Sequence, residues 1–165
     1  MARLAVLDLG TNTFHLLIAE RVSADAFREL YKEKRFIKLA AEGIERIGDA
    51  SMRRAQQTLQ DYRQILDRYQ VQDVRVLGTA ALRTATNGLD LMQWAAEEVQ
   101  MDIQIISGKR EAALIQLGVY QSLPDRSRRY LVMDIGGGSV EFIIAEQDSI
   151  QWSQSFPVGA AVLLR

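Results

Sequence analysis

The sequence predicts an α/β protein with a mixed sheet and flanking helices, followed by the first strands of a second, similar domain. Three observations lead to this prediction. Residues 130–146 repeat residues 4–20, strand-like segments open the chain, and helices and strands alternate over residues 51–121. A strand meander followed by alternating strands and helices forms a sheet with both antiparallel and parallel neighbours. We expect one domain over residues 1–125 and the start of another over residues 126–165.

The composition excludes several classes of protein. The 165 residues are 48% hydrophobic and 25% charged, as is usual for globular domains. The 20 Lys and Arg residues nearly balance 21 Asp and Glu residues, whereas nucleic-acid-binding chains usually have a basic excess. The absence of cysteine excludes disulfides and thiolate sites, and the single histidine argues against a Ser-His-Asp triad. Asp8 interrupts the first apolar run, which is too short for a membrane span. We expect a cytoplasmic protein with no nucleic-acid or membrane partner.

The repeat has an offset of 126 residues. It pairs LAVLDLGTNTFHLLIAE (residues 4–20) with YLVMDIGGGSVEFIIAE (residues 130–146), and six of 17 positions are identical. In each copy an apolar run ends in Asp, a turn of small residues follows, and a second apolar run ends in Ala-Glu. Apolar runs bounded by glycine indicate buried strands, and a short turn between two strands indicates a hairpin. The repeat therefore predicts two equivalent hairpins.

The segment between the copies completes the first sheet. Residues 27–37 are predicted to form a third, exposed strand. Residues 51–69 are predicted to form a helix with Ser51 as its N-cap, because apolar residues recur at spacings of three and four. Further strands are expected at 74–77 and 103–106, and further helices at 87–101 and 108–121. In the last helix we expect three side chains to face inward: Leu114, Leu117 and Tyr120.

The two turns of the repeat carry donors suited to phosphate. They consist of Gly10, Thr11, Asn12 and Thr13 in the first copy and Gly136, Gly137, Gly138 and Ser139 in the second. Successive N–H groups can converge on an anion where no Cβ intervenes, and the hydroxyl and amide groups add donors. Asp8 and Asp134 precede the turns and are placed to hold a hydrated divalent cation beside phosphate. A tight turn also needs glycine, but its recurrence after Asp favours phosphate binding.

Three further side chains are candidates for chemistry. Glu111 lies near a helix start, with Gly108 as the expected N-cap, and either caps the helix or acts as a general base toward water. Arg83 follows a strand end, and its guanidinium suits a phosphate oxygen, although a surface arginine is the alternative. Glu141 occupies the position of His15 in the repeat, so it either faces a polar cleft or binds a metal. His15 itself is expected to be structural.

Four motifs together resemble the exopolyphosphatase/guanosine pentaphosphate phosphohydrolase family of the actin-like ATPase superfamily. They are DLGTNTFHLLIAE, GTAALRTATNG, IISGKREAALIQLGV and MDIGGGSVEFII, in the family's order and over nearly the whole chain. The resemblance implies ribonuclease-H-like (actin-type) domains with the site in the cleft between two of them. It also implies that relatives continue well beyond residue 165.

The same resemblance implies an activity and roles for residues. The family hydrolyses terminal phosphates of inorganic polyphosphate, guanosine pentaphosphate or both, with Mg²⁺, which connects it with the stringent response. Its site residues correspond to Glu111 as the catalytic glutamate, Arg83 as the phosphate-contacting arginine, residues 10–13 and 136–139 as phosphate loops, and Asp134 and Glu141 as the carboxylates near metal and water. Asp8 joins the metal candidates from its place before the first turn, not from the resemblance. Arg110 departs from the pattern, because many relatives have an acid there.

We therefore expect a phosphoanhydride hydrolase. The alternatives are a non-catalytic module that binds polyphosphate or nucleotide, an inactive fragment, and a relative of sugar or acetate kinases, which would need an adenosine pocket. The strands of the second hairpin lack most of their sheet, so we also expect exposed edges, with aggregation, a swapped homodimer or loose packing at this end.

Overall fold

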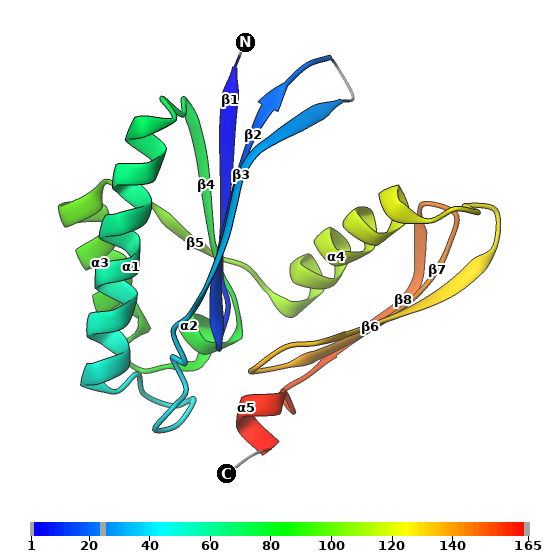
Figure 1. The fold of residues 1–165 in the computed structure, drawn as a ribbon. Coiled ribbons are helices and arrows are strands. Elements are labelled where there is room, and N and C mark those ends of the chain that lie inside the picture. Colours follow the sequence, from blue (N-terminus) through cyan, green and yellow to red (C-terminus); the bar gives the residue numbers. More distant parts are fainter. Residues whose placement is uncertain (1, 24–25, 164–165) are drawn as a thin grey trace.

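The computed structural model describes residues 2–23 and 26–163, which form two packed units (Figure 1). The first unit contains β1 (Arg3–Leu9), β2 (Thr13–Arg21), β3 (Phe27–Phe36), α1 (Asp49–Arg68), β4 (Asp73–Gly78), α2 (Ala80–Thr84), α3 (Gly88–Val99) and β5 (Ile103–Ile105). The second contains α4 (Gly108–Ser122), β6 (Arg129–Ile135), β7 (Val140–Glu146), β8 (Ser149–Phe156) and α5 (Ala160–Leu163). The α/β prediction is confirmed.

The first sheet has the mixed topology that the sequence predicts. Its strand order is β3-β2-β1-β4-β5, with antiparallel pairs at β1/β2 and β2/β3 and parallel pairs at β1/β4 and β4/β5. Helices α1 and α3 cover one face (Figure 1). The predicted stripe of α1 is confirmed, since Leu59 and Tyr62 are fully buried in the core with Leu7 and Leu16. The Tyr62 hydroxyl also donates a hydrogen bond to the Phe14 carbonyl (3.2 Å).

The second unit is a three-stranded antiparallel sheet, β6-β7-β8, with α4 against one face. Ala112 of α4 packs on Ile143 and Ala145 of β7. Gln116, which is buried, donates to the Tyr130 hydroxyl (2.9 Å). This helix thus links the two units, because its N-terminus follows the first sheet and its body covers the second.

The repeat is visible in the strand register. Asp8 pairs with His15 in the first hairpin, and Asp134 pairs with Glu141 in the second. Even the irregularity in the next pair of strands recurs: the β2/β3 register shifts between residues 18 and 19, and the β7/β8 register shifts between residues 144 and 145. The prediction of two equivalent hairpins is confirmed.

Some details differ from expectation. Helix α1 starts two residues early with Gly48 at its N-cap, while the Ser51 hydroxyl donates to the Lys38 carbonyl (2.8 Å). The short helix α2 was not predicted, because five residues are too few to show a helical period. In α4, Leu117 is 48% exposed, since the helix turns its Ala112 and Gln116 side toward the second sheet.

The division of the chain at residue 125 stays a prediction. Helix α4 precedes that boundary in sequence, yet its contacts are with β6, β7 and β8. In packing terms the second unit therefore begins near Ser107, where α4 is capped.

Candidate active site

The two predicted phosphate loops share one backbone arrangement. The Gly10 N–H donates to the Thr13 carbonyl (3.0 Å), and the Gly136 N–H donates to the Ser139 carbonyl (2.9 Å). Each bond closes the turn that follows an Asp-bearing strand. The structural repeat thus includes the loops as well as the strands.

The glycines of the second loop allow it to pack directly on the first. A Cβ on Gly138 would lie 2.5 Å from the Thr11 hydroxyl oxygen and 2.7 Å from the Ala80 Cβ. A Cβ on Gly137 would lie 2.9 Å from Cγ of Asn12. Neither glycine has a positive φ, so space and not backbone conformation requires glycine at both positions. Close approach of the loops brings their donors together at one place.

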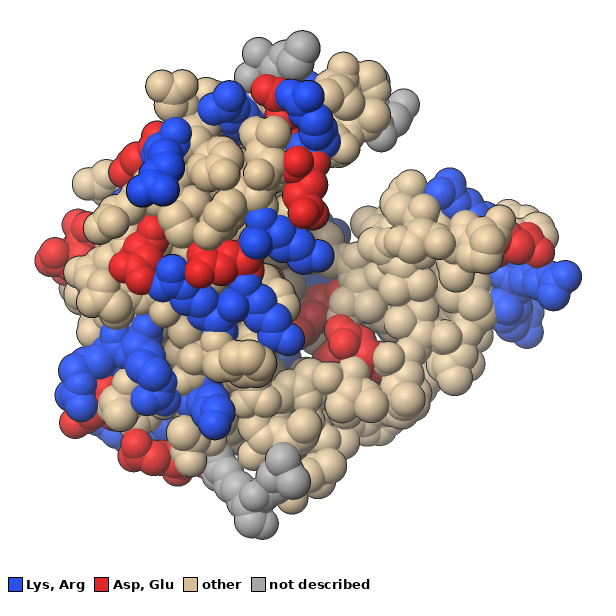
Figure 2. Space-filling view, in the orientation of Figure 1, with Lys and Arg blue, Asp and Glu red and all other residues tan. Residues whose placement is uncertain are grey.

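The loops and the strand ends beside them line a single cleft of about 330 Å³. Acidic side chains lie in the hollow between the two units (Figure 2). The cleft brings together most of the residues that the sequence singled out: Asp8, Gly10, Thr11, Asn12, Thr13, Glu111, Asp134, Gly136, Gly137, Gly138, Ser139 and Glu141. Arg83 lies outside this lining, in an adjoining cavity that shares Gly138 and Ser139.

Asp8 and Asp134 lie one residue before the ends of the equivalent strands and line the same cleft. Both residues keep contact with solvent, but the cleft walls desolvate their carboxylates and raise the pKa of each. The charge of Asp134 further raises the pKa of Asp8, which His15 partly offsets, and the charge of Glu141 raises that of Asp134. Such mutual repulsion means that a cation between the carboxylates would be stabilising.

Glu111 is the most strongly perturbed acid of the cleft. Its side chain is 17% exposed, and burial together with the nearby charge of Glu141 raises its pKa to about 7. Arg83 opposes this shift, because its Nη1 lies 3.4 Å from Oε2 of Glu111. The same nitrogen donates to the Ile106 carbonyl (2.6 Å), which holds the guanidinium beside the glutamate. A carboxylate with a pKa near 7 is suited to accept a proton at neutral pH.

Glu111 is not the cap of its helix. The N-cap of α4 is Ser107, and its hydroxyl accepts a hydrogen bond from the Arg110 N–H (3.2 Å). The expectation of Gly108 as N-cap was therefore wrong, since the serine one residue earlier supplies a side-chain acceptor that glycine lacks. With the cap provided by Ser107, the Glu111 carboxylate lies in the cleft.

Glu141 is buried, with 1% of its surface exposed, and Ser155 donates a hydrogen bond to its Oε1 (2.7 Å). The two residues are paired across β7 and β8, so they project from the same face of the second sheet. A buried carboxylate is costly unless it is paired or hydrogen-bonded. Ser155 provides one bond, and a cation in the cleft would provide further compensation.

Thr11 carries an unsatisfied group at the floor of the cleft. Its residue is 3% exposed, and its hydroxyl oxygen has no hydrogen-bond partner in the described part of the chain. Leaving a buried hydroxyl unpaired costs about 1–3 kcal/mol. A ligand oxygen bound between the loops would satisfy it.

The donor set fits magnesium that is shared with a phosphate. Within residues 2–23 and 26–163, no group of three or more His, Asp or Glu side chains forms a protein-only metal site. Mg²⁺ is commonly held by one or two carboxylates together with substrate phosphates and water. Asp8, Asp134 and Glu141 line the cleft next to the phosphate loops and can supply such ligands.

Four residues of the site were not among the predicted site residues. His15 and Lys34 line the cleft from β2 and β3, Thr79 lines it at the end of β4, and Ser155 holds Glu141. Thr79 stands in the Gly-Thr turn before Arg83, which was a usable signal. His15 was expected to be structural, and nothing in the sequence of β3 or β8 distinguishes Lys34 or Ser155 from their neighbours.

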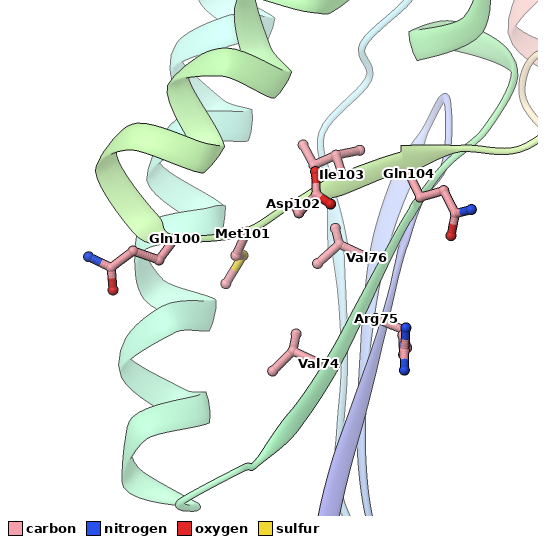
Figure 3. A pocket seen from close by; sticks show the side chains of 8 residues that line it. All are labelled: Val74, Arg75, Val76, Gln100, Met101, Asp102, Ile103 and Gln104. Carbon is pink, nitrogen blue, oxygen red and sulfur yellow. The ribbon is translucent and has the colours of Figure 1, made fainter.

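A larger cavity, about 580 Å³, lies elsewhere, beside the edge of the first sheet (Figure 3). Residues of β4, β5 and the segment between α3 and β5 line it: Val74, Arg75, Val76, Gln100, Met101, Asp102, Ile103 and Gln104. It contains none of the predicted site residues and no glycine loop. Size alone therefore does not identify the functional site of this protein.

Comparisons with known proteins agree with this geometry. Residues 17–165 match the Ppx/GppA phosphatase family. The guanosine-5'-triphosphate,3'-diphosphate pyrophosphatase of Aeromonas hydrophila is 37% identical over 163 residues, which cover 97% of this chain and 32% of the relative. An exopolyphosphatase structure from Cytophaga hutchinsonii is 44% identical with a TM-score of 0.95, covering 98% of this chain and 52% of that one. The Aquifex aeolicus PPX-GPPA enzyme is 25% identical with a TM-score of 0.82, covering 96% and 53% of the two chains.

The chain thus spans about a third to a half of the relatives it matches. The neighbours have the actin-like ATPase fold, so the ribonuclease-H-like (actin-type) prediction is confirmed. Among the helices that the structure describes, none is both long and apolar enough to cross a membrane.

Proposed function

We propose a function from one premise: this chain belongs to the Ppx/GppA phosphatase family. The proposal is that the chain carries the catalytic carboxylate and the phosphate loops of a phosphoanhydride hydrolase. The proposed substrates are inorganic polyphosphate and guanosine pentaphosphate, from which the terminal phosphate is released. The names of the relatives support both substrates. The observation that carries the proposal is the position of Glu111, beside Arg83 and in a cleft formed by two glycine loops.

The loops provide the proposed phosphate site. Backbone N–H groups of residues 10–13 and 136–139 and the hydroxyls of Thr11, Thr13 and Ser139 would donate to the terminal phosphate oxygens. The unpartnered Thr11 hydroxyl supports this role, because a phosphate oxygen would remove the cost of its burial.

Glu111 is the proposed general base. It would accept a proton from a water molecule as the water oxygen attacks the terminal phosphorus, and the bond to the bridging oxygen would break on the opposite side. Its pKa of about 7 places this transfer in the neutral range. Phosphate release should therefore increase with pH as the deprotonated fraction of Glu111 increases, with a midpoint at or below about 7, because a bound cation would offset the charge of Glu141.

Arg83 is the proposed partner of the transferred phosphoryl group. Its guanidinium is fixed by the Ile106 carbonyl and lies beside Glu111, next to the second phosphate loop. Positive charge that is already in place favours the charge distribution of the transition state. The same guanidinium limits how far the pKa of Glu111 rises.

Asp8, Asp134 and Glu141 are the proposed ligands of a divalent cation, with Mg²⁺ as the proposed ion. When bound, the ion supplies positive charge that offsets repulsion between carboxylates and phosphate. The raised pKa values of Asp8 and Asp134 support this assignment, because desolvation and neighbouring carboxylates disfavour the ionised form of both, and a cation would offset that cost. Ser155 keeps the Glu141 carboxylate in place.

The variant Glu111→Gln tests the proposal, because it keeps the side chain's size and a hydrogen-bond acceptor but removes the base. With Mg²⁺ present, we expect calorimetry to show that medium-chain polyphosphate still binds. Release of orthophosphate should fall at least about a hundredfold. Glu98→Gln, an exposed change on α3, serves as the matched control and should retain both properties.

The outcomes separate the candidate functions. Ordinary turnover in Glu111→Gln would show that Glu111 is not the base. Binding without release by the unmodified chain would favour a non-catalytic polyphosphate-binding module. Tight binding of ATP without hydrolysis of polyphosphate or guanosine pentaphosphate would contradict the phosphatase proposal and favour a kinase relative.

A further inference from the structure

The cleft contains much more negative than positive charge. Asp8, Glu111, Asp134 and Glu141 line it, whereas Lys34 is the only Lys or Arg in the lining formed by the described residues. Carboxylates repel a polyanionic ligand, so such a ligand needs positive charge in the cleft. Arg83 supplies one such charge from the adjoining cavity beside Glu111, and Lys34 supplies the other from within the cleft lining.

Lys34 lies at the far end of a row of side chains from the carboxylates. It pairs with His15 across β3 and β2, and His15 pairs with Asp8 across β2 and β1. Directly paired residues project from the same face of a sheet, so the three side chains form one row on the cleft face. Neighbouring strands lie roughly 5 Å apart, so the row extends about 10 Å. It leads from the carboxylates to the edge of the first sheet.

The ammonium group of Lys34 is available to a ligand. Its Nζ lies 5.3 Å from the centre of the Phe36 ring, a contact that positions a cation but leaves N–H donors for other partners. No ion pair engages Lys34 within the described ranges of the chain. The next residue, Arg35, is bound to both Glu33 and Asp61 and is not available in this way.

We infer that Lys34 binds a phosphate beyond the terminal one, on the leaving-group side of the bond that is broken. The terminal phosphate would lie between the loops and Glu111, and the following phosphates would extend past His15 to Lys34. The cleft would then select ligands with several linked phosphates over orthophosphate. This inference rests on the proposed function and adds a determinant of substrate length to it.

Calorimetry on the 165-residue chain carrying Glu111→Gln, which should bind the probe without hydrolysing it, tests the inference with Mg²⁺ present and with tripolyphosphate and orthophosphate as the probes. Lys34→Ala should weaken tripolyphosphate binding at least about tenfold, the effect expected for one lost charge-assisted hydrogen bond. Orthophosphate binding should stay unchanged, because the terminal site does not reach Lys34. Lys34→Arg should retain most of the affinity. Lys32→Ala, an exposed lysine on the same strand outside the cleft lining, is the matched control.

Two results would overturn the inference but not the proposed function. They are an unchanged affinity of Lys34→Ala for tripolyphosphate, and an equal loss of affinity for tripolyphosphate and orthophosphate. The second result would show general damage to the cleft and no selection by length. If the unmodified chain bound neither tripolyphosphate nor longer polyphosphate, the proposed function and the inference would both fail. The two failures are therefore distinguishable.

Discussion

At the scale of single residues, Glu111 shows a conflict between reactivity and stability. Burial and the charge of Glu141 raise its pKa to about 7, which suits a base but makes the ionised form costly in the folded chain. Active sites commonly contain groups whose environment disfavours the charge that the chemistry requires. The effect on stability has a definite sign and can be measured.

Replacing Glu111 by Gln should stabilise the chain at alkaline pH and not at acidic pH. The folded-state pKa of about 7 exceeds the ordinary value of 4.5, so between these values the folded chain binds a proton more readily than the unfolded chain. Stability of the unmodified chain therefore falls as pH rises through this window, by about 3 kcal/mol. Urea denaturation should show that Glu111→Gln is more stable than the unmodified chain by this amount at about pH 8. At about pH 4 the two chains should have almost the same free energy of unfolding. An equal difference in the free energy of unfolding at both pH values would contradict the raised pKa of Glu111.

Gly138 illustrates a second constraint on single residues. Gly138→Ala should destabilise the chain by about 1–3 kcal/mol, because the new Cβ would overlap the Thr11 hydroxyl and the Ala80 side chain. Phosphate binding should weaken as well, since the loops must separate. Gly118→Ala is the control: no atom lies within 4 Å of its added Cβ, and alanine in a helix should stabilise by about 0.5–1 kcal/mol. Thermal melts of both variants measure the two changes in stability. Equal changes in the two variants would contradict the close contact between the loops.

At the scale of elements, α1 shows why periodicity was a reliable guide. Its 20 residues have one apolar stripe against the first sheet, so the spacing in the sequence corresponds to a single packed face. In helix α4 the spacing of apolar residues does not decide which side is buried. This helix has large apolar residues on more than one side, and only the position of the second sheet decides which side is buried.

Leu59→Ala in α1 should lower the free energy of unfolding by about 2–5 kcal/mol, because Leu59 is fully buried and its loss leaves a cavity. Leu89→Ala in α3 should change it by less than about 0.5 kcal/mol, since that side chain is 69% exposed. Chemical denaturation measures both. A small effect at Leu59 would mean that the core relaxes around the substitution.

At the scale of the whole molecule, the two sheets are covered on opposite faces. Helix α1 covers the face of β1 that carries Ala5, Leu7 and Leu9. The repeat equivalents on β6 are Leu131, Met133 and Ile135, which are 62%, 55% and 61% exposed. Helix α4 packs on the other face of β6, against Tyr130 and Val132. The second sheet thus presents an apolar face that its counterpart buries.

This 165-residue chain should self-associate through that apolar face. We expect light scattering to show an average mass that increases with concentration, because association buries apolar area. The double variant Leu131→Lys, Met133→Lys should shift the chain toward the monomer, and Gln121→Lys, an exposed change at the end of α4, should not. A stable monomer for the unmodified chain at high concentration would contradict this expectation.

Much of the site could be predicted because its parts are local. The two loops, Asp8 and Asp134 follow directly from the repeat, and Glu111 from the start of its helix. Lys34 and Ser155 could not be predicted, because each contributes through a partner that is distant in sequence. Lys34 joins the cleft only through strand pairing with His15, and Ser155 only through pairing with Glu141.

The sequence by itself determined most strands, most helices, the repeat and the loops, since these depend on short-range periodicity and on small residues at turns. Only the tertiary structure decided which sheet α4 covers, why Gly138 must lack a Cβ, and that the pKa of Glu111 rises to about 7. The physical reason is the same in each case. Burial, overlap and electrostatic coupling are set by neighbours from distant segments, and their distances are defined only once the two units pack together.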